Sequence, residues 1–173
     1  MITEKKILET GEHIKSAYEI STRFVEFHER FNIQVPYQVF LDTESNEELK
    51  ITQPILTAIR HFENIDDEMI SRISMEALSH YERCIETTEF GIATEELRLK
   101  YNDDLKQINN QHFNINSTES AFENLKPIEV LITQKKDENQ NEYVISCWQF
   151  DVPWESEHGM VIHLKDGEIT LVE

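Results

Sequence analysis

Residues 143–169 read YVISCWQFDVPWESEHGMVIHLKDGEI, and this stretch decides the fold. Its first ten residues are apolar on both faces of an extended chain, which is typical of a central strand in a sheet. The segment 153–159 predicts a turn, the run MVIHL predicts the next strand, and Asp166-Gly167 is a strong signal for a two-residue hairpin. The carboxyl-terminal third therefore predicts an antiparallel β-meander.

The chain on either side extends the predicted sheet. The alternating residues 128–133, IEVLIT, predict a strand, the polar run 135–142 predicts a hairpin loop, and EITLVE predicts the closing strand. Residues 18–42 are rich in aromatic and β-branched types with a period of two, which favours strands, with Pro36 at an edge or between two strands. A helix over 14–31 stays open as an alternative, because apolar residues there also share one helical face.

Three amphipathic helices are predicted in the middle of the chain. Thr52 caps the first, Asp66 or Asp67 caps the second, and Thr94 caps the third. Their apolar stripes are Ile55, Ala58, Ile59 and Phe62; Met69, Ile73, Ala77, Tyr81 and Cys84; and Leu97, Tyr101, Leu105 and Ile108.

Polar segments separate these elements. Residues 43–49 and the Asn-rich run 109–117 predict loops, 118–125 predicts a short helical turn, and 1–15 predicts a frayed start. Because helices and strands are segregated along the chain, the fold class is α+β. We expect a single domain over residues 1–173, in which an antiparallel sheet packs against about three helices.

Charge is the strongest global signal. Sixteen basic residues face thirty-four acidic ones, a formal net charge of −18. Such a surface repels nucleic acid and anionic lipid and attracts basic proteins, although the same charge also serves solubility. No nucleic acid or membrane partner is therefore expected, and composition leaves the oligomeric state open.

The start of the chain has no apolar targeting segment, and no run is long enough to span a bilayer. Cys84 and Cys147 both lie in apolar patterns, which indicates core filling rather than chemistry. We therefore expect a cytoplasmic protein with reduced thiols.

The hexapeptide 154–159, WESEHG, is the main candidate site, and three interpretations apply to it. Glu155, Glu157 and His158 could form an acid–base cluster. His158 and His163 could bind a metal, although no further ligand has the spacing of a zinc motif. The third interpretation is structural and is favoured: Trp154 plugs the core, the carboxylates accept turn N–H groups, and Gly159 takes a positive φ where the chain re-enters the sheet.

Other signatures of chemistry do not occur in the sequence. It contains no nucleophile elbow, phosphate loop, dinucleotide fingerprint or calcium loop, so no cofactor is predicted. His61 and His80 fall on separate helices away from the main apolar stripes, so both are expected to be exposed.

The order of these elements, with Trp154, Glu155, Glu157, His158 and Gly159 followed by an apolar strand and the Asp166-Gly167 turn, resembles an uncharacterised bacterial family of small acidic proteins. Members of that family carry a W-[DE]-x-E-H-G motif, and some are suspected immunity proteins against polymorphic toxins. The resemblance covers roughly residues 31–173 and supports the fold more than the function.

A binding role is therefore the leading hypothesis. We expect a non-enzymatic protein-binding module, and as its specific form an immunity protein that blocks a basic toxin. The alternative is a hydrolase or metal-dependent enzyme that uses the hexapeptide. A dimer joined through an exposed edge strand is a third hypothesis.

Overall fold

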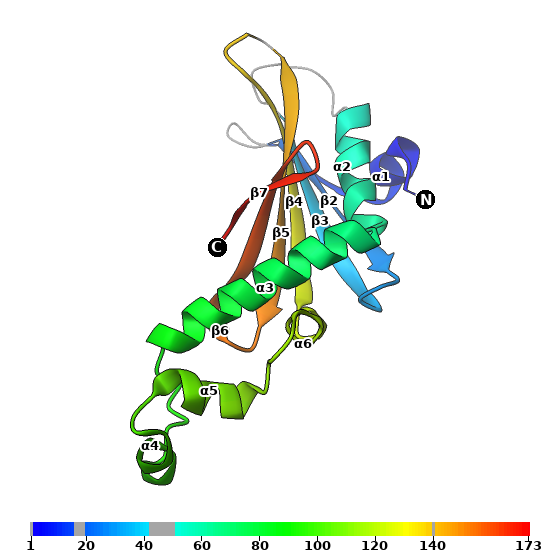
Figure 1. Cartoon of the computed structure of the whole chain (residues 1–173). Helices are drawn as coiled ribbons and strands as arrows, with labels where there is room; N and C mark the ends of the chain where they lie inside the picture. The colour runs from blue at the N-terminus through cyan, green and yellow to red at the C-terminus, as the bar shows by residue number, and fades with distance from the viewer. Residues whose placement is uncertain (1, 16–19, 42–50, 140) are drawn as a thin grey trace. The chain divides into compact units, whose positions relative to one another are not determined.

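The structure, a computed structural model, describes residues 2–15, 20–41, 51–139 and 141–173, without the side chains of Leu41 and Ser156 (Figure 1). These residues form two compact units. The sheet unit comprises the described residues within 1–65, 127–150 and 161–172, and the helical unit comprises residues 66–126, 151–160 and 173. The predicted single domain over 1–173 stays a prediction.

Seven strands form one sheet in the order in which they occur along the chain. The β1–β2, β2–β3 and β6–β7 pairs are antiparallel, and β3–β4 is parallel. The strands are β1 (Glu12–Lys15), β2 (Ile20–His28), β3 (Ile33–Leu41), β4 (Lys126–Lys136), β5 (Glu142–Val152), β6 (Glu155–Lys165) and β7 (Glu168–Val172). The mixed helix and strand content and the mostly antiparallel sheet agree with the expected α+β class.

The described residues contain six helices, where about three were predicted. They are α1 (Glu4–Thr10), α2 (Gln53–Glu63), α3 (Asp67–Thr87), α4 (Glu95–Tyr101), α5 (Leu105–Phe113) and α6 (Thr118–Glu123). The predicted caps are confirmed: Thr52, Asp66 and Thr94 each accept a hydrogen bond from the backbone N–H three residues later. The predicted helical turn at 118–125 is α6, whose cap is Ser117.

The predicted third helix is wrong as one continuous element. Asn102 and Asp103 adopt φ values of 52° and 58°, a left-handed conformation that an α-helix cannot contain. Asp104 then caps a new helix by accepting the N–H of Gln107 at 3.1 Å. This new helix, α5, continues to Phe113, so most of the predicted Asn-rich loop at 109–117 is helical instead.

The amino-terminal predictions need two corrections. Residues 1–15, expected to be frayed, contain α1 and β1, with Ile2 and Ile7 buried. The helix alternative over 14–31 is wrong because residues 20–28 are strand β2, as the strand prediction had it. Pro36 lies inside β3, but pairing with β4 begins only at Tyr37, so the missing proline N–H costs no ladder bond there. The loop predicted at 43–49 lies outside the described residues.

The predicted turn at 153–159 is shorter than expected. Only Pro153 and Trp154 separate β5 from β6, and residues 155–159 belong to β6. Gly159 does adopt a positive φ of 72°, as the glycine suggested. The Asp166-Gly167 hairpin is confirmed, because both residues have the positive φ values, 51° and 92°, that such a turn requires.

Aromatic rings fill the core of the sheet unit. Phe62 of α2 is fully buried and meets Trp148 edge-on at 4.9 Å and Tyr37 edge-on at 6.1 Å. Tyr37 also stacks on Phe24 at 5.0 Å across the β2–β3 pair. Such rings dominate the hydrophobic stabilisation of a core. The Tyr37 hydroxyl and the Trp148 indole N–H, both buried, have no hydrogen-bond partner among the described residues.

Candidate functional site

Trp154, at the start of the hexapeptide, is part of the core of the helical unit. Its side chain is fully buried, and its ring meets Tyr81 of α3 edge-on at 5.4 Å. The indole N–H donates to Nδ1 of His80, one residue earlier on α3, at 2.9 Å. A buried indole N–H needs such an acceptor, so the pair holds the β5–β6 turn against α3.

His80 is buried, and the prediction that it is exposed is wrong. Because Nδ1 accepts from Trp154, the neutral ring carries its proton on Nε2. Burial lowers the pKa of His80 and favours this neutral form. His61, in contrast, is exposed as predicted.

Cys84 lies one helical turn beyond His80, with Sγ 4.0 Å from both ring nitrogens. Burial, with a smaller contribution from Glu155, raises the pKa of the Cys84 thiol. A cysteine nucleophile requires the opposite shift, because the thiolate is the reactive species. Cys147 is half-buried in the sheet unit, and neither cysteine is in a disulfide.

The remaining hexapeptide side chains do not converge as a catalytic cluster would. Glu155 accepts the backbone N–H groups of Glu157 at 3.1 Å and His158 at 3.4 Å. His158 Nδ1 is 3.9 Å from the same carboxylate, beyond hydrogen-bond length, and the His158 side chain is 84% exposed. Glu157 is also exposed. The Glu155 carboxylate therefore stabilises the backbone of its own segment.

The alternative metal pair is also separated in environment. His163 lies on β6 in the sheet unit, where its Nδ1 is 3.2 Å from Cys147 Sγ, whereas His158 belongs to the helical unit. Within the described ranges, no group of three or more His, Cys, Asp and Glu side chains is placed to hold a metal ion.

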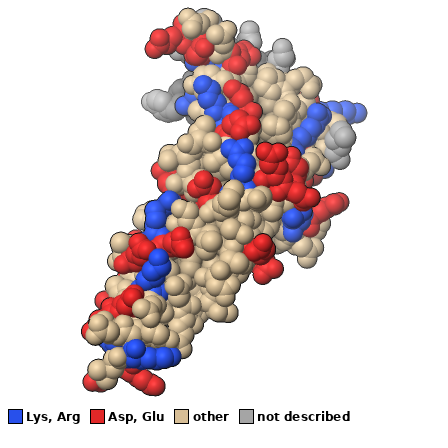
Figure 2. Space-filling view, in the orientation of Figure 1, with Lys and Arg blue, Asp and Glu red and all other residues tan. Residues whose placement is uncertain are grey.

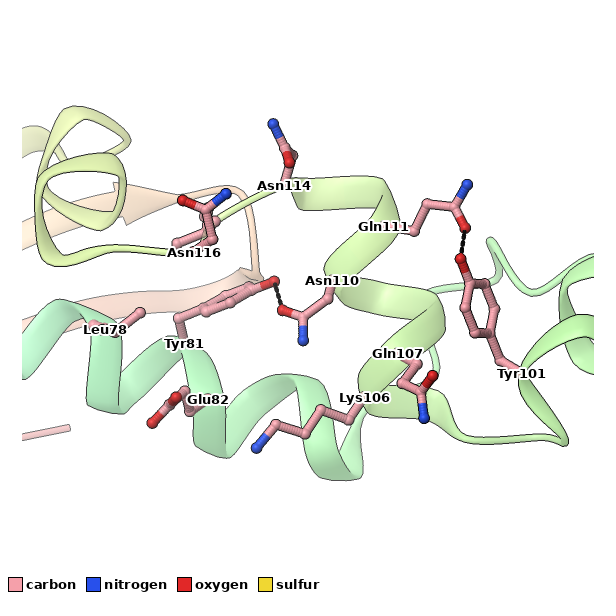
Figure 3. A pocket seen from close by; sticks show the side chains of 11 residues that line it. Leu78, Tyr81, Glu82, Tyr101, Lys106, Gln107, Asn110, Gln111, Asn114 and Asn116 are labelled. Atoms are coloured by element: carbon pink, nitrogen blue, oxygen red, sulfur yellow. Dashed lines mark hydrogen bonds between the residues drawn. The ribbon is translucent and has the colours of Figure 1, made fainter.

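A hollow of the helical unit lies elsewhere, between α3 and α5 (Figure 3). This amide groove has a volume of about 490 Å³. Glu82 and Lys106 lie at one side of it in Figure 3, and Asn114 and Asn116 lie at the other. Its most unusual feature is its set of amides and tyrosines: Gln107, Asn110, Gln111, Asn114, Asn116, Tyr81 and Tyr101.

Hydrogen bonds fix two of these amides. The Tyr81 hydroxyl donates to Asn110 Oδ1 at 2.7 Å, and the Tyr101 hydroxyl donates to Gln111 Oε1 (Figure 3). Both amide oxygens thus accept a tyrosine hydroxyl, and both NH₂ groups have no acceptor among the described residues. The groove does not follow from a loop over residues 109–117, although the helical spacing of the amides at 107, 110, 111 and 114 is a signal for it in the sequence.

A smaller hollow of about 320 Å³ lies in the sheet unit, between α2 and the β6–β7 turn. His61, Ser146 and Asp166 line it, a set of residue types that can form a hydrolytic triad. However, the Asp166 carboxylate accepts the N–H of Val144 at 3.0 Å, and His61 makes no hydrogen bond to either partner. The nucleophile–base and base–orienter contacts of a triad are therefore missing from this part of the described chain.

Comparison with known proteins identifies one family that matches the chain. A protein-family model described as "Domain of unknown function (DUF6985)" matches residues 10–173. No curated protein and no solved structure matches the chain. Within the residues that the structure describes, no helix is both long and apolar enough to cross a membrane.

Proposed function

The chain belongs to the DUF6985 family of domains of unknown function, and we propose that it is a non-enzymatic binding module for a basic protein. One observation carries the proposal. Thirty-four acidic residues face sixteen basic ones, so the acidic residues outnumber the lysines and arginines by eighteen. A surplus of this size attracts cationic proteins over long distances and accelerates their docking.

On the face that Figure 2 shows, the acidic residues do not gather in one patch. Residues 66–126 alone contain thirteen acidic and six basic residues. Figure 2 shows carboxylates in several separate groups on the visible face, with lysines and arginines between them. A spread charge steers a partner but does not define an epitope, so affinity must come from a few well-packed anchors.

Two apolar side chains of β2 are candidates for such anchors. Val25 is 54% exposed and Phe27 is 55% exposed. The two residues are two positions apart on β2, so their side chains lie on one face of the strand. Their cross-strand partners on β3 are Pro36 and Gln34. An exposed aromatic beside an exposed aliphatic side chain is typical of a protein contact.

We further propose that the partner is a toxin, that the complex covers the toxin's active site, and that the protein acts as an immunity protein in the bacterial cytoplasm. The support for this finer proposal is the resemblance of the hexapeptide to the W-[DE]-x-E-H-G motif. The same hexapeptide supports binding over hydrolysis, because Trp154 is buried and Glu155 accepts two backbone N–H groups instead of orienting His158.

The test is a purified complex. Tagged protein is incubated with a lysate of its native host, and any captured protein with a high isoelectric point is purified and titrated against the chain at low and high salt. We expect the association rate to fall steeply with salt, because screening removes long-range attraction. Phe27→Ser should accelerate dissociation, whereas Leu99→Ser, which changes another exposed apolar residue, should not. A partner that is acidic, or an association rate independent of salt, would contradict the proposal.

A further inference from the structure

The amide groove offers hydrogen-bonding groups that have no partner among the described residues. Asn110 and Gln111 present NH₂ donors, because their oxygens accept the tyrosine hydroxyls and their nitrogens meet no acceptor in the described part of the chain. Gln107 presents an acceptor oxygen, since its nitrogen donates to Asp104 at 2.8 Å. The side chains of Asn114 and Asn116 make no hydrogen bond to the described residues. The groove therefore offers both donors and acceptors, and its two fixed amides are donors.

The spacing of these amides matches an extended polypeptide. Residues 107, 110, 111 and 114 recur every three or four positions and so lie on one face of α5 and its cap. From 107 to 114 the helix rises about 10 Å at 1.5 Å per residue. An extended chain covers that distance in about three residues, each of which offers one carbonyl acceptor and one N–H donor.

The charges around the groove select the kind of peptide. Glu82 lines the groove, and Lys106 is paired with Glu86, whose carboxylate lies 2.7 Å from its Nζ. Lys100 Nζ lies 3.4 Å from Gln111 Oε1. These nearby charges roughly balance, so the acidic surplus of residues 66–126 sets the sign of the field, which disfavours phosphates and carboxylates and favours lysine and arginine.

A sugar is a weaker fit to the same groups. Carbohydrate sites usually combine polar side chains with an open aromatic face on which a ring can stack. Tyr81 is only 1% exposed, and its ring is packed edge-on against Trp154 and Phe113. Its face is therefore not offered to a ligand, and Lys100 Nζ lies over the ring of the second tyrosine, Tyr101, 4.7 Å from its centroid.

We propose that the amide groove binds the main chain of an extended, lysine- or arginine-rich segment of the partner protein. This proposal rests on the proposed function for its choice of a polypeptide ligand. Recognition is through the backbone, with the amides of α5 pairing with successive peptide groups, and the acidic surroundings select flanking cationic side chains.

The experiment uses a capped hexapeptide of alternating lysine and glycine as the probe. Side-chain NH₂ resonances of the full chain are followed by ¹⁵N–¹H NMR during titration, and we expect those of Asn110, Gln111, Asn114 and Asn116 to shift together. A control peptide has N-methylglycine in place of glycine, which keeps the charge and removes main-chain N–H donors. We expect it to bind roughly tenfold more weakly, as expected from the loss of one or two hydrogen bonds. Equal affinity for the two peptides would overturn the proposal, as would amide shifts with maltose and none with the peptide.

Two variants sharpen the test. Asn110→Asp keeps the acceptor for the Tyr81 hydroxyl and replaces the NH₂ donor with a carboxylate. If the groove reads main-chain carbonyls, this variant binds the peptide several-fold more weakly despite its added negative charge. Asn102→Asp, which adds the same charge outside the groove at a left-handed position that Asp tolerates, should bind equally well or slightly better. Tighter binding by Asn110→Asp would show that only charge is recognised and would overturn the proposal.

Asn116→Ala provides a second reading that does not disturb the Tyr81 contact, because Asn116 is exposed and its side chain makes no hydrogen bond to the described residues. We expect Asn116→Ala to weaken peptide binding as well. Unchanged binding by both Asn110→Asp and Asn116→Ala would contradict the proposal that the groove binds the peptide. A basic partner whose affinity is unaffected by Asn110→Asp overturns the groove inference and leaves the proposed function standing. The absence of a basic partner removes the proposed function without changing the peptide titration.

Discussion

Acid should destabilise the helical unit through His80, and the size of the effect follows from linkage. His80 is buried, its Nδ1 accepts the Trp154 N–H, and burial lowers its pKa in the folded state below the ordinary 6.5. The unfolded chain therefore binds the proton more readily than the folded chain. The contribution of neutral His80 to the free energy of unfolding is fully present above pH 6.5. It is lost as the pH falls through the folded-state pKa of His80. Between the two pKa values the loss approaches about 1.4 kcal/mol per pH unit for one proton.

The measurement compares wild type with His80→Gln between pH 5 and pH 7.5. Glutamine can accept the Trp154 N–H through its amide oxygen but does not titrate in this range. Native-state hydrogen exchange of the α3 amides gives the free energy of opening of the helical unit. We expect the wild type to lose stability relative to the variant as the pH falls, with a slope of up to about 1.4 kcal/mol per pH unit.

Other titrating groups do not obscure this comparison. Burial also lowers the pKa of His28, and burial followed by repulsion from Glu26 raises the pKa of Glu63. Both residues are present in the two proteins, so their contributions cancel in the difference. If the wild type and His80→Gln lose stability in parallel as the pH falls, His80 is not the titrating group, and the reasoning from its burial fails.

Three further changes test the packing. Gly167→Ala should lower the free energy of unfolding by about 1–2 kcal/mol, because φ is +92° and a Cβ would lie 2.4 Å from His61. Adding His61→Ala should recover only the part of this loss that comes from the clash. Equal thermal stability of Gly167→Ala and wild type would contradict this. Glu155→Ala should lower the free energy of unfolding by about 1 kcal/mol through loss of two N–H contacts, whereas the exposed control Glu157→Ala should stay within about 0.5 kcal/mol in the same urea titration. Phe62→Ala should cost about 3–5 kcal/mol and unfold the sheet unit at lower urea, and a smaller loss would mean that the aromatic core collapses around the cavity.

Local chemistry explains what the sequence predicted well. Thr52, Asp66 and Thr94 mark helix starts because their short side chains satisfy N–H groups that every helix leaves open. The break after Tyr101 was missed because the apolar period continues across it, from Leu97 to Ile108. Apolar periodicity does not reveal a left-handed break when apolar residues recur at helical spacing on both sides of it.

The contact between His80 and Trp154 shows a different limit. The two residues are 74 positions apart, and no local pattern pairs them. A signal for the burial of His80 was present, since Ile73, Ala77 and His80 follow the four-then-three spacing of one helical face. The residue type, which is usually exposed or intermediate, outweighed the spacing in the prediction.

One residue connects the hexapeptide to the amide groove. The Tyr81 ring packs edge-on against Trp154 at 5.4 Å, and its hydroxyl donates to Asn110 at 2.7 Å (Figure 3). Trp154 therefore supports the tyrosine that orients the amide, and it is anchored in turn by the preceding residue of α3, His80. On this basis we infer that Trp154 of the hexapeptide positions Tyr81 and, through it, Asn110 of the groove.

The connection can be tested at a distance from the groove. Trp154→Phe removes the donor to His80 and part of the surface against Tyr81 while retaining an aromatic ring. We expect the side-chain NH₂ resonances of Asn110 to shift and the affinity for the lysine–glycine peptide to fall several-fold, because Tyr81 is no longer held in place. Glu157→Ala, which changes the hexapeptide without touching Tyr81, should leave both unchanged. If Trp154→Phe folds and leaves the Asn110 resonances and the peptide affinity as in the wild type, the two features are independent, and the hexapeptide serves only the turn.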